Sequence, residues 1–179
     1  MNIYKKIIIV IVVIVILPSL IFQIILPMMN ISRVFSIPSS SMNPTILKND
    51  KVLVSMNVDD LKTDDIVAYD ISNKKIGGNT KQLKRIVAVS GDRISRNGNT
   101  LLINGMELCE LVNYQDSYDL KNWVNILNGE YILPEGMYFI IGDNINNSLD
   151  SRTYGPIAQK DIVGKFKFKM GILGYFLFL

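Results

Sequence analysis

The chain contains no histidine, and this absence removes the side chain that most serine and cysteine hydrolases use as their base. A Ser-His-Asp triad cannot form, although serine hydrolases that use a lysine instead do exist. Cys109 is the only cysteine, so the chain has no intrachain disulfide and no cysteine-built zinc site. A metal would need oxygen ligands alone, and the sequence has no calcium-loop spacing. We therefore expect neither a metal nor a cofactor.

The sequence also lacks a strong excess of charge, since its formal net charge is only +3. This balance argues against a strongly basic nucleic-acid binder. Lysines cluster near both ends of the chain, which suits an anionic membrane surface better than a nucleic-acid groove. Internal repeats and low-complexity linkers are absent as well. The length of 179 residues fits one domain with a core, plus an appendage.

An apolar stretch at residues 7–26 is interrupted only by Pro18, Ser19 and Gln23. As a helix it would rise about 30 Å, which is the thickness of the hydrocarbon core of a bilayer. The stretch is too long for a cleaved signal peptide, and no small-x-small cleavage site follows it. The stretch is therefore predicted to be an uncleaved signal-anchor.

Lys5 and Lys6 precede the apolar stretch, so the positive-inside tendency predicts a cytoplasmic N-terminus. The rest of the chain would then lie outside the cell membrane, which the chain crosses once. We expect a cytoplasmic tail at residues 1–6, a transmembrane anchor at residues 7–29 and an exported domain at residues 30–179.

Short strand-like runs and turn signals dominate the chain after the anchor, where no long helical periodicity appears. Asn97-Gly98 and Asn104-Gly105 are typical of tight hairpin turns, and a further turn is expected at residues 76–79. The expected strands lie at residues 51–55, 66–69, 83–89, 101–103, 138–143 and 165–169. The exported part is therefore predicted to be mostly β.

The sequence does not assign a structure to two segments. Residues 116–127 are too polar and irregular to assign. Residues 171–179 are apolar but too few to span a bilayer. They fit either the core of the domain or a second contact with the membrane interface.

Two segments carry the residue types that a serine–lysine hydrolase needs. Ser41 lies in a turn bracketed by Pro38 and Pro44, and Lys84 leads into an apolar, strand-like run. Burial lowers the pKa of a lysine, because desolvation disfavours the ammonium form, and so makes it a usable base. The Ser39 hydroxyl and the Ser41 N–H are candidates for stabilising an oxyanion. Taken alone, Ser41 also fits a serine that caps its own turn, and Lys84 a solvated lysine at a strand end.

A third segment, residues 142–155, is rich in glycine, amide, hydroxyl and carboxylate groups, and by itself it fits a polar surface loop. Together and in this order, the three segments resemble the signature boxes of bacterial type I signal peptidases. Residues 38–46 resemble P-S-x-S-M-x-P-T-L, with isoleucine at the last position. Residues 84–92 resemble K-R-x-x-G-x-x-G-D, with alanine at the inner glycine. Residues 142–155 resemble G-D-N-R-D-N-S-x-D-S-R-x-x-G, and residues 64–69 are similar to the family's smaller G-D-I-V box.

The resemblance implies a β-rich catalytic domain of the kind shared by signal peptidases and LexA-like self-cleaving repressors, behind a transmembrane helix. It implies a serine endopeptidase that cleaves signal peptides, with small residues before the cut, from exported preproteins at the lipid bilayer. The implied catalytic groups are Ser41 as nucleophile, Lys84 as general base, Ser148 as the group that orients the lysine, and Ser39 with Ser41 as the oxyanion hole. The implied supports of the site are two pairs, Asp143 with Arg85 and Asp150 with Arg152. The implied pocket residues are Ile37, Met42, Ile46 and Leu83.

Ile145 and Asn146 replace an arginine and an aspartate of the family's late box, which removes a charged pair near the site. A dedicated processing peptidase of a pilus or cell-surface pathway therefore remains an alternative. A catalytically inactive, membrane-tethered assembly factor is a second alternative, although the retained Ser41 and Lys84 weigh against it. A self-cleaving repressor would need a DNA-binding segment where this chain has its anchor. The lack of histidine favours the bacterial or organellar branch of the family over the endoplasmic-reticulum branch.

Overall fold

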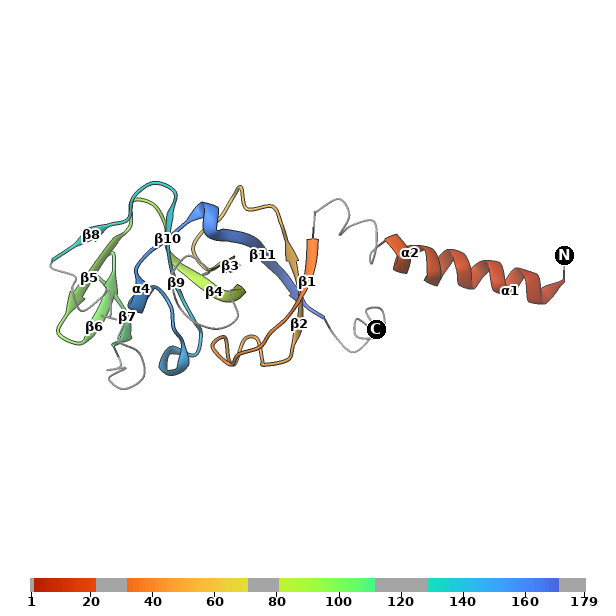
Figure 1. Ribbon diagram of the computed structural model, residues 1–179, viewed down its shortest axis with the longest axis horizontal. Coiled ribbons are helices and arrows are strands. Elements are labelled where there is room, and N and C mark those ends of the chain that lie inside the picture. Colours follow the sequence, from red (N-terminus) through yellow and green to blue (C-terminus); the bar gives the residue numbers. More distant parts are fainter. Residues whose placement is uncertain (1, 22–31, 71–80, 112–128, 171–179) are drawn as a thin grey trace.

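The computed structural model describes residues 2–21, 32–70, 81–111 and 129–170. An apolar helix opens the chain as α1 (Ile3–Ile11), a π-helical segment η1 (Val12–Ile16) and α2 (Leu17–Leu20). The span Ile3–Leu20 is long and apolar enough to cross a membrane, and none of it is buried in the protein. Figure 1 shows this helix standing clear of the β-rich body. The helix begins before residue 7, where the sequence predicts the anchor to start, and the predicted end at residue 29 lies outside the described residues.

A seven-stranded antiparallel sheet forms most of the body, in the order β1-β2-β11-β3-β4-β9-β10. Register shifts interrupt β11 at two points, and such bulges bend a strand. The strands are β1 (Ser32–Ser36), β2 (Lys51–Ser55), β3 (Ile66–Asp70), β4 (Lys81–Ala88), β9 (Met137–Ile141), β10 (Ile157–Ala158) and β11 (Ile162–Lys169). Three short helices, η5 (Ile145–Asn147), α4 (Ser151–Tyr154) and η6 (Gln159–Asp161), lie in the connections after β9 and β10.

A second sheet has four strands in the order β7-β6-β5-β8 and lies at the end of the body away from the helix (Figure 1). Asn104 and Gly105 join β6 to β7 with φ angles of 53° and 78°. Positive φ at both central residues fits the type I′ turn that Asn-Gly favours. The strands of this sheet are β5 (Arg93–Asn97), β6 (Thr100–Ile103), β7 (Met106–Glu110) and β8 (Tyr131–Ile132).

The central strands β3 and β4 are buried on both faces. Ala68 and Leu83 belong to a core cluster on one face, together with side chains from the turn after β1. Tyr69 and Ile86 belong to a second cluster that β9 and β10 complete on the other face. Because alternate side chains of a strand point to opposite faces, β4 supplies both clusters and holds its central side chains away from water.

The mostly β architecture predicted from the sequence is confirmed. The strand predicted at residues 51–55 coincides with β2, and the other predicted runs each overlap a strand. β4 begins at Lys81, two residues before the predicted start, because its first two residues are polar but still pair with β3. The turn expected at residues 76–79 and the open segments at residues 116–127 and 171–179 lie outside the described residues.

Candidate active site

Ser41 lies in the turn that follows β1, and this turn is tied to the core. The Ile37 N–H donates a 3.0 Å hydrogen bond to the Asp50 carbonyl, which closes the base of the loop. Within the turn, the Ile46 N–H donates to the Met42 carbonyl at 2.9 Å. Met42 and Ile46 are both buried in the core cluster beneath β1 and β4. The backbone around Ser41 is therefore fixed on both sides by hydrogen bonds and packing.

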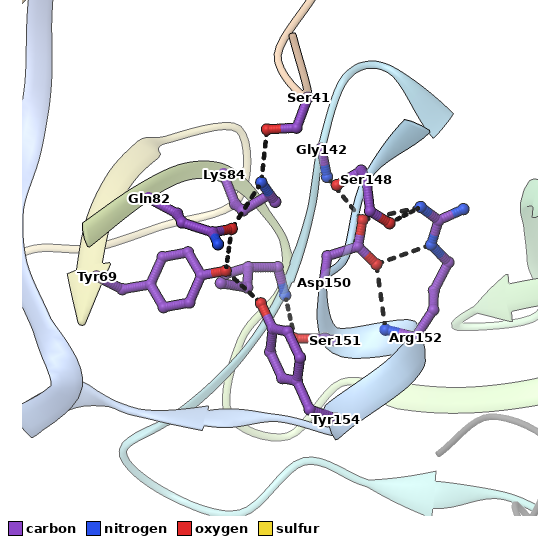
Figure 2. Close-up of polar contacts among 11 residues, drawn as sticks. Ser41, Tyr69, Gln82, Lys84, Gly142, Ser148, Asp150, Ser151, Arg152 and Tyr154 are labelled. Atoms are coloured by element: carbon purple, nitrogen blue, oxygen red, sulfur yellow. Dashed lines mark hydrogen bonds and ion pairs between the residues drawn. The ribbon is translucent and has the colours of Figure 1, made fainter. Parts of the chain in front are cut away.

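Lys84 approaches Ser41 from the middle of β4 (Figure 2), and only 1% of its surface is exposed. Its Nζ lies 2.7 Å from Ser41 Oγ, within hydrogen-bond distance. Burial lowers the pKa of Lys84 from its ordinary value of 10.5 to about 8, against the opposing attraction of the Asp150 carboxylate. A lysine with this pKa loses its proton at mildly alkaline pH and can accept one from a hydroxyl.

Two further acceptors surround the Lys84 ammonium. The Leu83 carbonyl oxygen lies 3.2 Å from Nζ, and the Gln82 side-chain oxygen lies 3.3 Å from it. The hydroxyl of Ser39 lies 3.2 Å from that of Ser41, beside the oxygen that would attack a substrate. The predicted nucleophile, base and oxyanion-hole hydroxyl are thus gathered at one point, from segments that are 43 residues apart in sequence.

The loop after β9 presses against the Ser41 turn through backbone and amide contacts. The Asn144 N–H donates to the Ser41 carbonyl at 3.0 Å, and the Asn144 side-chain amide donates to the Ser40 carbonyl at 3.1 Å. A Cβ on Gly142 would lie 2.5 Å from the Ser41 carbonyl oxygen and 2.2 Å from Ser148 Oγ. A side chain at position 142 would therefore displace the turn, which explains why a glycine stands there.

Ser148 is buried in the same loop, next to Gly142 (Figure 2). Its carbonyl oxygen accepts a hydrogen bond from Arg152 Nη2 at 3.3 Å. The three hydrogen bonds of Lys84 given above go to other groups. The role of Ser148 in orienting the lysine therefore stays a prediction.

Two bidentate ion pairs brace the ends of this loop. Arg85 Nε and Nη2 donate to the two Asp143 carboxylate oxygens at 2.9 and 2.7 Å, and Thr45 donates to Asp143 at 2.5 Å. Burial tends to raise the pKa of Asp143, but the hydrogen bonds from Arg85 and Thr45 outweigh it and lower the pKa. The other pair, Arg152 and Asp150, is bidentate at 2.8 Å for both contacts.

Asp150 is fully buried and also accepts a hydrogen bond from the Gly142 N–H at 3.1 Å. Removing one member of a buried ion pair usually costs about 3–5 kcal/mol, because the other charge is left uncompensated. The Asp150–Arg152 pair therefore holds the loop in one conformation beside Ser41. Both arginine–carboxylate pairs that the family resemblance implies are present in the structure.

A small pocket of about 110 Å³ opens beside Ser41. Of the four residues predicted to line a substrate pocket, Ile37, Met42 and Leu83 line this cavity. Ile46 is instead fully buried in the core cluster beneath them. The remaining lining residues are Phe35, Ser36, Pro38, Ser39, Ala68, Lys81 and Gln82.

The sequence interpretation missed several polar residues at the site, among them Gln82, Tyr69 and Tyr154. Gln82 could have been found, because a residue two positions before Lys84 on a strand shares its face. No sequence signal joins Tyr154 to Tyr69, which is 85 residues away but hydrogen-bonded to it.

Comparisons with known proteins agree with this geometry. The family model described as "Signal peptidase, peptidase S26" matches residues 4–171. Signal peptidase I T of Bacillus subtilis is 32% identical over 141 residues, which cover 75% of this chain and 71% of the relative. Signal peptidase IB of Staphylococcus aureus is 29% identical over 146 residues, covering 75% of each chain.

Among solved structures, a signal peptidase I from Enterococcus faecalis aligns with 62% of this chain and 100% of its own, at 24% identity and a TM-score of 0.41. The family match spans nearly the whole chain and includes the segments that carry Ser41, Lys84 and Asp150. The chain therefore belongs to the S26 family of signal peptidases, on its bacterial type I branch, and is a serine peptidase.

Proposed function

We propose that this chain is anchored in the cell membrane and removes N-terminal signal peptides from exported preproteins with Ser41 as nucleophile and Lys84 as base. The observation that carries the proposal is the 2.7 Å contact between Lys84 Nζ and Ser41 Oγ in a chain without histidine. Lys84 is buried and its pKa is lowered to about 8, so it meets the requirement for a base that acts without a histidine.

In the acylation step, Ser41 Oγ attacks the scissile carbonyl carbon while its proton passes to the neutral Lys84 Nζ. The carbonyl electrons move onto oxygen, and the Ser41 N–H and the Ser39 hydroxyl donate to this oxyanion. The tetrahedral intermediate collapses, the carbon–nitrogen bond breaks, and the leaving amine takes the proton from Lys84. The mature protein departs, and the signal peptide remains as an ester on Ser41.

In the deacylation step, Lys84 accepts a proton from a water that attacks the ester carbon. The second tetrahedral intermediate breaks the bond to Ser41 Oγ, which recovers the proton from Lys84. Ser148 is proposed to orient the lysine in its ammonium form in both steps, when Nζ carries a third N–H group. Every proton transfer therefore uses the same nitrogen, and no further acid or base is required.

Substrate selection follows from the pocket beside Ser41. It lies between the end of β1 and the start of β4, and β1 is an edge strand of the large sheet. An extended peptide can add backbone hydrogen bonds along such an edge and place alternate side chains into pockets. The volume of about 110 Å³ and the apolar lining from Ile37, Met42 and Leu83 suit small side chains before the cut.

The apolar helix would hold the enzyme at the membrane. Lys5 and Lys6 near its start favour a cytoplasmic N-terminus, which places the β-rich domain on the extracytoplasmic side. Signal peptides emerge on that side, so the anchor would hold the active site close to the membrane surface at which their cleavage sites appear.

Covalent labelling tests the nucleophile directly. The detergent-solubilised full chain is incubated with an acylating penem, and the adduct is located by mass spectrometry. We expect one adduct on Ser41, none in Ser41→Ala, and an unchanged adduct in Ser90→Ala, which alters an exposed serine in the turn after β4. Equal labelling of Ser41→Ala and the parent would show that Ser41 is not the nucleophile.

A further inference from the structure

Gln82 stands on β4 two residues before Lys84, so both side chains point to the same face of the sheet. The register of β3 and β4 places Tyr69 directly opposite Gln82, and Val67 opposite Lys84. Figure 2 shows the Gln82 side chain between the Lys84 ammonium and the two tyrosine hydroxyls. The half-buried Gln82 therefore separates the catalytic lysine from the pair formed by the fully buried Tyr69 and the half-buried Tyr154.

The hydrogen bonds around Gln82 have a defined direction. Gln82 Oε1 lies 3.3 Å from Lys84 Nζ and also accepts from the Tyr69 hydroxyl at 3.3 Å. An ammonium can only donate, so it requires the amide oxygen, not the amide nitrogen, to face it. Tyr69 donates its single hydroxyl proton to Gln82, so the hydrogen bond between the two tyrosines must be donated by Tyr154 to the Tyr69 oxygen. Burial raises the pKa of both tyrosines, so both keep their protons while the enzyme works.

The neutral lysine amine needs this arrangement to act on Ser41. It has two N–H groups and one lone pair, and only the lone pair can accept the serine proton. The Leu83 carbonyl at 3.2 Å and Gln82 Oε1 at 3.3 Å are positioned to take the two N–H groups. With both N–H groups engaged, the lone pair is left facing Ser41 Oγ, 2.7 Å away.

We propose that Gln82 is a positioning residue that directs the Lys84 lone pair onto Ser41, with its own oxygen held by the Tyr69–Tyr154 hydroxyl pair. This role rests on the proposed Ser41–Lys84 chemistry and adds a group that acts only through the lysine. Gln82 does not exchange protons in the reaction, since its amide oxygen accepts hydrogen bonds throughout.

Two substitutions separate positioning from general packing. Gln82→Met keeps a similar volume but removes the acceptor, so the charged lysine loses a stabilising partner and its pKa falls. Gln82→Glu keeps an acceptor and adds a negative charge about 3 Å from the ammonium, which raises the lysine pKa by about one unit or more. A role in packing alone would not move the lysine pKa in opposite directions in the two variants.

The test measures the pH dependence of kcat for cleavage of a preprotein, beside melting temperatures. Because Gln82 also lines the pocket, KM is measured separately. We expect the acid limb of the kcat profile to move to lower pH in Gln82→Met, with a plateau about 10–100-fold below the parent. This is at or below the lower end of the roughly 10²–10⁴-fold that general acid–base catalysis contributes, because the base is misdirected but not removed. In Gln82→Glu the limb moves to higher pH. Gln159→Met, which loses only a contact with the Val58 carbonyl, should match the parent.

A second readout is independent of activity. The titration of Lys84 is followed by NMR in protein labelled at the lysine side-chain carbons, with the signal assigned by its loss in Lys84→Met. Opposite shifts in Gln82→Met and Gln82→Glu support the positioning role even in a preparation that cleaves no substrate, which would count against the proposed function alone. A parent-like pKa and a parent-like kcat profile in both Gln82 variants would overturn the inference.

Discussion

At the scale of single residues, Lys84 meets two opposing demands. Catalysis needs it neutral, and the apolar faces of β3 and β4 supply this by excluding water. The same burial destabilises the folded state, because an ammonium group loses its hydration when it enters the core. The three acceptors around Nζ and the nearby Asp150 carboxylate only partly offset that loss, since the pKa of Lys84 remains below its ordinary value.

The first prediction concerns the pH dependence of acylation. Only the neutral amine accepts the Ser41 proton, and the pKa of Lys84 is about 8. The acylation rate should therefore rise tenfold per pH unit below about pH 8 and level off about one unit above it. Stopped-flow measurement of penem acylation from pH 6 to pH 10 provides the profile. A limb centred near 10.5, the ordinary value for lysine, would show that Lys84 is not held in an apolar site.

The second prediction concerns stability. The pKa of Lys84 is about 8 in the folded state and 10.5 in an ordinary environment, so the unfolded chain binds more protons between these values. Lys84 therefore lowers the free energy of unfolding below pH 8, by up to about 3 kcal/mol, and this penalty fades as the pH rises to 10.5. Lys84→Met should be more stable than the parent at pH 7, with a smaller advantage at pH 10.

Urea unfolding of both proteins at the two pH values measures this difference. Lys160→Met, which alters an exposed lysine, serves as the matched control and should show little change at either pH. A Lys84→Met variant that is less stable than the parent at pH 7 would mean that the ammonium is better solvated than its burial indicates.

Some residues of the site can be predicted from the sequence, and others cannot. Ser41 and Lys84 are visible because the chain has no histidine and because the segments around them resemble the family's boxes, whereas each residue alone also fits a structural role. Ile46 lies in the core and not in the pocket, because the turn after β1 directs it inward, and a motif alone does not define that direction. Gln82 follows from the two-residue period of a strand, whereas Tyr154 depends on tertiary packing that no local pattern encodes.

At the scale of elements, the close approach of the loop after β9 to the Ser41 turn sets the geometry of the site. Gly142 makes this approach possible, because a Cβ there would lie 2.5 Å from the Ser41 carbonyl oxygen. The Asp150–Arg152 and Asp143–Arg85 pairs then hold the loop against the turn. The loop therefore acts as a support for the nucleophile although it supplies no attacking atom.

The third prediction is that Gly142→Ala lowers kcat about 10–100-fold, because a displacement of the nucleophile by a fraction of an ångström to 1 Å has costs of that order. Gly136→Ala is the matched control. It strains a residue with a φ of +70°, but its Cβ meets open space, so it should lose stability without losing kcat. Parent-like kcat in folded Gly142→Ala would show that the turn yields to the added methyl group at no catalytic cost.

Elements with a clear period are predictable from the sequence, and those without one are not. The alternation and apolar runs at β2, β3 and β4 follow from their two buried faces. The Asn-Gly turn before β7 follows from the positive φ that both residues tolerate. β8 and β10 have two residues each, too few to show a period, and they form only because longer strands offer them an edge.

At the scale of the whole molecule, the chain consists of an apolar N-terminal helix and a β-rich domain that carries the candidate active site. The helix buries none of its span Ile3–Leu20 against the protein, which fits a segment whose natural surroundings are lipid. Its apolar length is readable directly from the sequence, because a long apolar run needs no tertiary contact to be recognised. The strand order of the seven-stranded sheet cannot be read from the sequence. β11 lies between β2 and β3 although it begins more than 90 residues after β3 ends.

The most direct test is cleavage of a preprotein with an Ala-x-Ala site by the purified, detergent-solubilised chain, with the new N-terminus identified by mass spectrometry. Ser41→Ala and Lys84→Ala are assayed in parallel, with melting temperatures to show that each is folded. We expect the parent to cut directly after the second alanine and neither variant to cut. Near-normal cleavage by Lys84→Ala would contradict the Ser41–Lys84 mechanism, because the histidine-free chain has no other buried base at 2.7 Å from Ser41 among its described residues.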